Sequence, residues 1–285
     1  MRKFRLRKQK PKIERDVIPL RVMVPNLVTM MSAAAGITSI RFSCTGSTNH
    51  EHFRIAVIMI VVACFLDGID GGVARMLKAT SKLGAQLDSL ADFVSFGVAP
   101  ALFTYFWIMD VVQPDHSLYP IRGVFWAFAL FYALCCAFRL ARFNIMLDDE
   151  ITQPYWKHFF MGLPAPGGAG LLLTPAIWQL HTDMDLFQSP LISSAALLIF
   201  GTLMASRFPT PSLKKLRIPA RYQIPFLIFV LFLIGMLIAH SWLTLGCIGI
   251  AYIVTIPLCG YLYLKAKRRH ESRVGNTHIL ETPRL

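Results

Sequence analysis

Charged residues are scarce in this sequence, and long polar stretches are absent. Only 16% of the 285 residues are Asp, Glu, Lys or Arg, whereas 55% are hydrophobic and the mean hydropathy is +0.52. The apolar residues come in runs of about twenty, the length that an α-helix needs to cross a bilayer. These features exclude a soluble globular domain and predict an all-α polytopic membrane protein.

The sequence also lacks the cysteine and histidine spacings of a zinc site and of a disulfide-rich domain. Its six cysteines lie mostly within apolar runs, so we interpret them as small hydrophobic residues. No small-residue cleavage site follows the basic N-terminus, which predicts that the first apolar run is kept as a helix. We find no internal repeat.

About eight transmembrane helices are predicted. They cover residues 24–42, 54–77, 85–109, 121–145, 165–181, 189–206, 223–240 and 242–264. Most Lys and Arg residues fall in the polar stretches 1–21, 78–84, 146–164, 207–222 and 265–285, and none falls in 43–53, 110–120 or 182–188. Because positive charge marks cytoplasmic loops, this alternation predicts that both termini are cytoplasmic.

The net charge of +13 does not predict a nucleic-acid partner, because the basic residues sit in the short stretches that set membrane topology. The cluster in residues 1–21 is interpreted first as a topology signal, with contact to anionic lipid headgroups as the alternative. We therefore expect membrane lipids as partners. The expected location is a membrane, the inner or plasma membrane of a bacterium.

Four aspartates stand inside the second and third apolar runs. The pattern is Asp67-x-x-Asp70-Gly71-x-x-Ala74-Arg75, eight residues, then Gly84-x-x-x-Asp88-x-x-x-Asp92. A carboxylate at membrane depth costs about 2.5 to 3.5 kcal/mol, so four of them require a compensating ligand. On a helix the members of each pair share one face, and the predicted topology brings both pairs to similar depth at the cytoplasmic side. A single polar site facing the cytoplasm is expected.

Carboxylate oxygens beside glycines and one arginine favour Mg²⁺ or Mn²⁺ together with a substrate diphosphate. Other interpretations exist for parts of the pattern. Gly68-x-x-x-Gly72 alone is typical of helix packing, and a lone intramembrane Asp is typical of a proton relay or ion pathway. An EF-hand is excluded because the loop spacing and the bidentate Glu are missing.

Residues 67–92 match the signature of the CDP-alcohol phosphotransferase family, and the chain resembles these membrane enzymes of phospholipid synthesis. The resemblance implies two divalent metal ions held by Asp67, Asp70, Asp88 and Asp92, with Asp92 also serving as the catalytic base. It implies a pocket for a CDP-linked lipid. The residues matching that pocket are Gly71, Ala74, Arg75 and Gly84, with Asn26 and Thr29 near the nucleotide base, where helix capping is the alternative role.

Segments 25–29, 89–100, 138–144 and 162–166 resemble the membrane-embedded phosphatidylserine synthases, a branch of that family. This likeness implies CDP-diacylglycerol and L-serine as substrates, CMP and phosphatidylserine as products, and a homodimer. Arg139, Arg142 and Asn144 are the candidate acceptor-binding residues, because a guanidinium fork fits a carboxylate. The fork also fits phosphate, and an interfacial anchor or topology signal is another interpretation of the two arginines.

The expected organisation is a basic cytoplasmic tail (1–21), a catalytic core of six helices (22–206), a basic loop with two C-terminal helices (207–264) and a polar cytoplasmic tail (265–285). One alternative function keeps the chemistry and changes the acceptor to glycerol 3-phosphate, an inositol phosphate or choline. A more distant alternative is a cation-coupled transporter, which the missing repeat disfavours.

Overall fold

A computed structural model describes residues 20–78, 81–148, 159–206, 209–211 and 220–280. The helices are α1 (Leu20–Cys44), α2 (His50–Met76), α3 (Lys82–Asp92), α4 (Ala99–Val111), α5 (Arg122–Asp148), α6 (Ala165–Thr182), α7 (Pro190–Ala205), α8 (Gln223–Ala239) and α9 (Ser241–Leu280). A π-helical segment, η2 (Phe93–Val98), joins α3 to α4. Short 3₁₀ turns are η1 (Gly46–Thr48), η3 (Tyr119–Ile121), η5 (Asp185–Gln188) and η7 (Ala220–Tyr222).

Each of the eight predicted apolar runs is helical, the third as α3, η2 and α4 together, and α9 extends past the end of the eighth run. Among the described residues, five helical stretches are long and apolar enough to cross a membrane, namely 23–44, 50–76, 83–111, 119–145 and 241–260. Two shorter apolar helices, α7 and α8, accompany them. The chain is therefore a polytopic helical membrane protein, while the number of eight spans stays a prediction.

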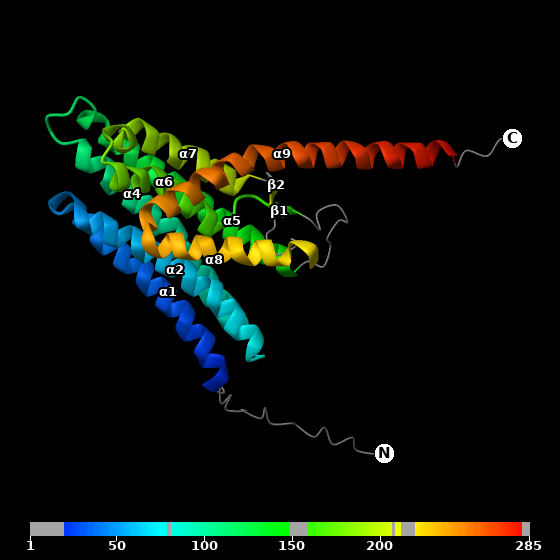
Figure 1. Ribbon diagram of the computed structural model, residues 1–285. Helices are drawn as coiled ribbons and strands as arrows, with labels where there is room; N and C mark the ends of the chain where they lie inside the picture. Colours follow the sequence, from blue (N-terminus) through cyan, green and yellow to red (C-terminus); the bar gives the residue numbers. More distant parts are fainter. Residues whose placement is uncertain (1–19, 79–80, 149–158, 207–208, 212–219, 281–285) are drawn as a thin grey trace, which may run out of the picture.

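Helices α1 and α2 form a closely packed pair that sets the position of the aspartates (Figure 1). The Ser32 and Ser39 hydroxyl groups of α1 donate hydrogen bonds to the Ala63 and Ala56 carbonyl oxygens of α2, at 3.0 and 2.9 Å. Hydroxyl groups commonly join helices in this way where lipid removes the hydrophobic driving force. The two bonds fix the position of α2 along the axis of α1.

The core lies where α2, α4, α5, α6 and α7 meet. Phe53 of α2 packs edge-on against Trp107 and Phe103 of α4, with ring centroids 4.9 and 5.6 Å apart. Tyr132 of α5 is fully buried beside η2. This aromatic packing fixes the rotation of α4 about its own axis. Because η2 joins α4 to α3, the rotation of α4 also determines the direction in which the aspartates of α3 point.

Two features lie outside the predicted pattern. The strands β1 (Phe159–Met161) and β2 (Pro209–Pro211) pair antiparallel, although segments this short carry no readable periodicity. Gly162 follows β1 at a φ of +78°, and a Cβ there would lie 2.9 Å from the Met204 and Ser206 carbonyl oxygens, so glycine is required.

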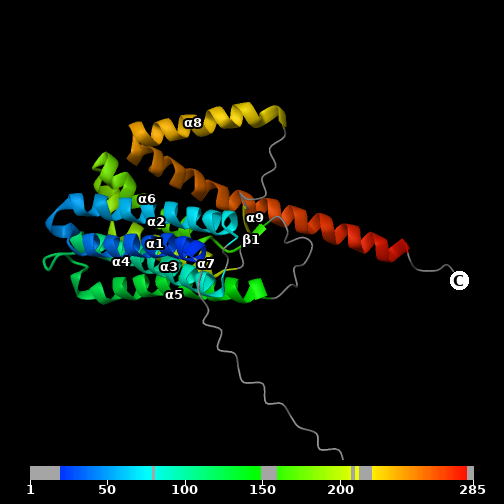
Figure 2. The same cartoon turned by 90° about the horizontal axis from the view of Figure 1, so that it is seen from below.

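The C-terminal helices differ from the rest of the bundle in their packing. Helix α8 stands apart and packs mainly on α9, as Figure 2 shows. Helix α9 packs on α6 and continues to Leu280, so the first part of the predicted polar tail is helical. The predicted tail residues 1–19 and 281–285 lie outside the described residues.

Candidate active site

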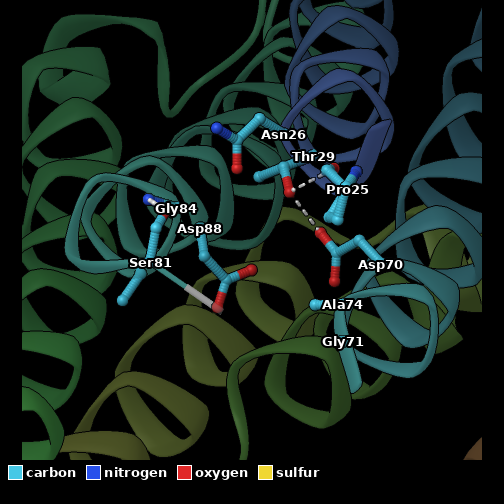
Figure 3. A pocket seen from close by; sticks show the side chains of 10 residues that line it. Pro25, Asn26, Thr29, Asp70, Gly71, Ala74, Ser81, Gly84 and Asp88 are labelled. Atoms are coloured by element: carbon cyan, nitrogen blue, oxygen red, sulfur yellow. Dashed lines mark hydrogen bonds between the residues drawn. The ribbon is translucent and has the colours of Figure 1, made fainter. Parts of the chain in front are cut away.

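Three of the four aspartates converge on one space. Asp67 and Asp70 come from α2 and Asp88 comes from α3, and each offers a carboxylate oxygen within 4.8 Å of those of the other two. Asp70 is buried, and the other two are half-buried. Figure 3 shows Asp70 and Asp88 facing each other across the gap between the two helices. Hard carboxylate oxygens at this spacing fit a small divalent cation such as Mg²⁺ or Mn²⁺.

Asp92 lies one helical turn after Asp88 and borders the same cluster. Its side chain is within hydrogen-bonding reach of Asp67 and close enough to Asp88 to feel its charge. Its charge also interacts with that of the Arg139 guanidinium of α5. Asp92 therefore interacts both with the carboxylate cluster and with a cationic side chain.

The Thr29 hydroxyl of α1 donates a hydrogen bond of 2.6 Å to Asp70 Oδ2. Thr29 is itself buried, and the Pro25 carbonyl oxygen lies 3.2 Å from the same hydroxyl. A partner that orients a ligating carboxylate tunes its affinity for metal. Thr29 thus orients the Asp70 carboxylate and also lines the pocket described next.

A pocket of about 160 Å³ opens beside the cluster, between α1, α2 and α3. Its lining includes Asn26, Thr29, Gly71, Ala74 and Gly84, with Asp70 and Asp88 at its edge (Figure 3). The space depends on small residues, because a Cβ on Gly84 would come within 2.9 Å of Asn26 Oδ1. The side chain of Ser81 accepts a hydrogen bond from Gly84 N at 3.0 Å and so starts α3 at this wall.

The structure brings five of the six predicted nucleotide-pocket residues to this pocket. The sixth, Arg75, is exposed in the last turn of α2, and its Nη1 lies 3.7 Å from the Cβ position of Gly71. Within the described residues, a Cβ on Gly68 or Gly72 would meet nothing within 4 Å. No described helix therefore packs on that glycine pair, which disfavours an intramolecular packing role.

The three predicted acceptor residues are not equivalent. Arg142 donates to the Ala205 and Ser206 carbonyl oxygens, at 3.2 and 2.9 Å, and so caps the end of α7. The Asn144 amide donates to the Ser89 hydroxyl at 2.9 Å. Arg139 differs, because its buried Nε has no hydrogen-bond partner among the described residues and its charge interacts with that of Asp92. Of the three, Arg139 is the one whose side chain forms no hydrogen bond to another described residue.

The segment η2, which sequence reasoning missed, follows directly after Asp92. Ser95 donates to the Ser32 carbonyl oxygen of α1 at 3.1 Å, and the Tyr132 hydroxyl of α5 donates to the Phe96 carbonyl oxygen at 3.3 Å. A Cβ on Gly36 would be 2.7 Å from Ser95 Oγ, so α1 approaches η2 very closely. π-Helical insertions are frequent at functional sites. The sequence carries no clear signal for it, because the segment continues an apolar span and Ser95 and Gly97 are its only small residues.

We expect Thr29→Val to raise the Mg²⁺ or Mn²⁺ concentration needed for half-maximal activity by roughly ten- to a hundredfold, since loss of such an outer partner costs that much in metal affinity or activity. A metal titration of turnover measures it. Thr38→Val is the matched control, because among the described residues Thr38 bonds only to the Ala34 carbonyl oxygen of its own helix. Equal metal requirements for the two variants would contradict the role given to Thr29.

The chain matches a known protein family and is similar to several named enzymes. Residues 22–206 match the model of the family described as CDP-alcohol phosphatidyltransferase, and residues 221–257 match that of CDP-alcohol phosphatidyltransferase 2. Proteins named CDP-diacylglycerol–serine O-phosphatidyltransferase are similar to the chain. One from Mycobacterium tuberculosis H37Rv is 34% identical, covering 82% of this chain and 77% of its own. One from Helicobacter pylori J99 is 32% identical (73% and 80%), and one from Bacillus subtilis 168 is 30% identical (67% and 92%).

Proposed function

Because the chain belongs to the CDP-alcohol phosphatidyltransferase family, we propose that it transfers the phosphatidyl group of CDP-diacylglycerol to the hydroxyl group of L-serine, giving phosphatidylserine and CMP. The observation that carries this assignment is the carboxylate cluster of α2 and α3 at the edge of a pocket lined by the family's small residues. The relatives described above bear the name of the serine enzyme.

Asp67, Asp70 and Asp88 would hold two divalent metal ions together with Asp92. Bound Mg²⁺ or Mn²⁺ would neutralise the diphosphate and stabilise the oxygen that leaves with CMP. The small residues Gly71, Ala74 and Gly84 leave room for the nucleotide, and Asn26 and Thr29 border it. Arg75 would donate a charge-assisted hydrogen bond to a phosphate oxygen.

Asp92 would remove the proton of the serine hydroxyl as it attacks. The bond that forms joins the serine oxygen to the phosphorus of the phosphatidyl group, and the bond that breaks joins that phosphorus to the oxygen of CMP. The proton ends on the Asp92 carboxylate. Direct displacement suits the site, since no Ser, Cys or His in the sequence pattern is placed as an activated nucleophile.

Arg139 would bind the carboxylate of serine and hold its hydroxyl near Asp92. Three observations support this role: the buried Nε without a partner among the described residues, the nearby Asp92 charge, and the commitment of Arg142 and Asn144 to protein groups. A guanidinium is suited to a planar carboxylate because it offers two parallel donors.

We expect Arg139→Ala to raise the KM for serine roughly ten- to a hundredfold, because hydrogen bonds to a charged group carry about 1.5 to 3 kcal/mol. The KM for CDP-diacylglycerol should change little. Arg142→Ala is the control, and it should lower thermal stability through the uncapped end of α7 rather than raise the KM for serine. A serine KM that rises equally in both variants would remove the special role of Arg139.

The reaction itself is tested with the purified chain, Mn²⁺ or Mg²⁺, CDP-diacylglycerol and labelled acceptors. Labelled serine should enter lipid while CMP is released in equal amount. Incorporation of glycerol 3-phosphate, an inositol phosphate or choline in place of serine would overturn the choice of acceptor. Uptake of a cation into vesicles without any CMP release would instead support the transporter alternative.

We further propose eight spans, with both termini and the aspartate cluster facing the cytoplasm, a homodimer, and a division into the tail 1–21, the core 22–206, the unit 207–264 and the tail 265–285. The alternation of Lys and Arg between loops supports the orientation. The separation of α8 from the core supports the boundary after residue 206. Labelling of single cysteines placed in the loops of intact cells tests the orientation.

A further inference from the structure

A second cavity, of about 260 Å³, lies at the opposite end of the bundle from the aspartates. It is formed by the first turns of α2, the end of α4, the end of α6 and η5. Arg54, at this cavity, precedes Asp70 by sixteen residues on α2, which is about 24 Å along a helix axis. The cavity is therefore separate from the proposed catalytic pocket.

Two buried polar side chains line this cavity without satisfied hydrogen bonds. Trp107 of α4 is 1% exposed and Gln179 of α6 is 9% exposed. Within the described part of the chain, Trp107 Nε1 and Gln179 Oε1 have no hydrogen-bond partner. An unmade hydrogen bond at a buried polar group costs free energy, so an occupant that supplies both partners would be favoured. The indole requires an acceptor, and the amide oxygen requires a donor.

Charged side chains of both signs surround the opening. The Arg54 guanidinium pairs with Glu51 at 3.1 Å and donates to the Leu180 carbonyl oxygen, also at 3.1 Å. Asp183, at the end of α6, forms no ion pair among the described residues. The Arg54 charge is thus matched by Glu51, and His50 of the same lining lies 3.8 Å from Asp110, whereas Asp183 has no ion-pair partner in the described part of the chain. The opening favours a cationic group next to the buried donor of Trp107.

We propose that this cavity binds a primary ammonium next to an oxygen acceptor, the chemistry of a small amino alcohol and of an aminophospholipid headgroup. The oxygen would accept from the Trp107 indole N–H, and the ammonium would donate to Gln179 Oε1 and Asp183. A volume of 260 Å³ exceeds the share of about 30 Å³ that one water molecule occupies, so a group of several heavy atoms fits. A quaternary ammonium has no N–H and would leave Gln179 unsatisfied.

The test uses the purified full-length chain and two matched pairs of probes. Ethanolamine is compared with choline by calorimetry, and phosphatidylethanolamine is compared with phosphatidylcholine of the same acyl chains by native mass spectrometry. We expect the primary amine of at least one pair to bind saturably and at least tenfold more tightly than its trimethylated partner. Binding of the lipid alone assigns the site to a headgroup, and binding of ethanolamine as well assigns it to the free amine.

Variants locate the binding in this cavity. Trp107→Phe and Gln179→Leu should each lower the affinity for the primary-amine probe at least tenfold. If either buried variant fails to fold, Asp183→Asn at the opening replaces it and should also lower this affinity. Trp178→Phe is the matched control, because Trp178 of α6 also has a buried indole N–H without a partner among the described residues but packs toward Gly246 of α9. Arg139→Ala controls for binding at the acceptor position.

Asp183→Asn should leave serine transfer within about twofold of the unmodified chain, which separates this proposal from the proposed function. Equal binding of the primary and trimethylated probes would overturn it, and so would the absence of saturable binding of either probe. Loss of binding in Arg139→Ala but not in Trp107→Phe or Gln179→Leu would also overturn it.

Discussion

Asp92→Asn should lower kcat for phosphatidylserine formation by roughly 10² to 10⁴, the contribution expected of a positioned general base. Asparagine keeps the size of the side chain but cannot take the proton of the serine hydroxyl. The cluster formed by Asp67, Asp70 and Asp88 stays complete in this variant. Binding of CDP-diacylglycerol should therefore be largely retained.

Labelled serine incorporation, CMP release and nucleotide binding are measured side by side. Asp110→Asn provides the control for a general effect of removing an acidic residue, because Asp110 ends α4 at the other end of the bundle and contacts His50 and Gln188. If Asp92→Asn retained more than about a tenth of the original kcat, another group would have to accept the proton. A loss of nucleotide binding equal to the loss of turnover would instead assign Asp92 to the metal site alone.

Deleting Val94 should abolish turnover while the bundle still folds. The segment η2 contains one residue more than an α-helix would need between α3 and α4, and one residue corresponds to a rotation of about 100°. The rotation of α4 is fixed by the buried rings of Phe103 and Trp107. Conversion of η2 to a regular α-helix would therefore turn Asp88 and Asp92 away from the aspartates of α2.

Turnover and thermal unfolding of the deletion variant are compared with those of a chain lacking Ser117, which lies in the exposed connection after α4. Tyr132→Phe is the milder variant if the deletion prevents folding, because it removes only the hydrogen bond to the Phe96 carbonyl oxygen. It should lower kcat more than it raises the KM for serine. Full activity of a folded Val94 deletion would show that η2 does not set the direction of these aspartates.

Hydropathy alone predicted where the helices run, because membrane helices must satisfy their backbone hydrogen bonds internally and so appear as uninterrupted apolar segments. The spacing of the aspartates predicted that they share faces, and the alternation of charged loops predicted that the two pairs lie at similar depth. The structure accordingly unites Asp67, Asp70 and Asp88. These features depend on local sequence and on the bilayer, which explains why they could be predicted from the sequence.

Features that depend on contacts between segments far apart in the chain could not be predicted from the sequence. Arg139 and Arg142 lie three residues apart and were expected to act together, yet Arg142 reaches the carbonyl oxygens at the end of α7, more than sixty residues away in the chain. The insertion in η2 is stabilised by bonds to Ser32 of α1 and from Tyr132 of α5. The cavity beside Gln179 likewise exists only because α2, α4 and α6 meet.

The central claim is that aspartates from α2 and α3 jointly hold divalent metal for a CDP-linked lipid, and Mn²⁺ binding followed by electron paramagnetic resonance tests it most directly. With CDP-diacylglycerol present, the unmodified chain should bind Mn²⁺ saturably, and the variant carrying Asp67→Asn, Asp70→Asn and Asp88→Asn should lose that binding while keeping its thermal stability. Equal Mn²⁺ binding by the two folded proteins would contradict the account.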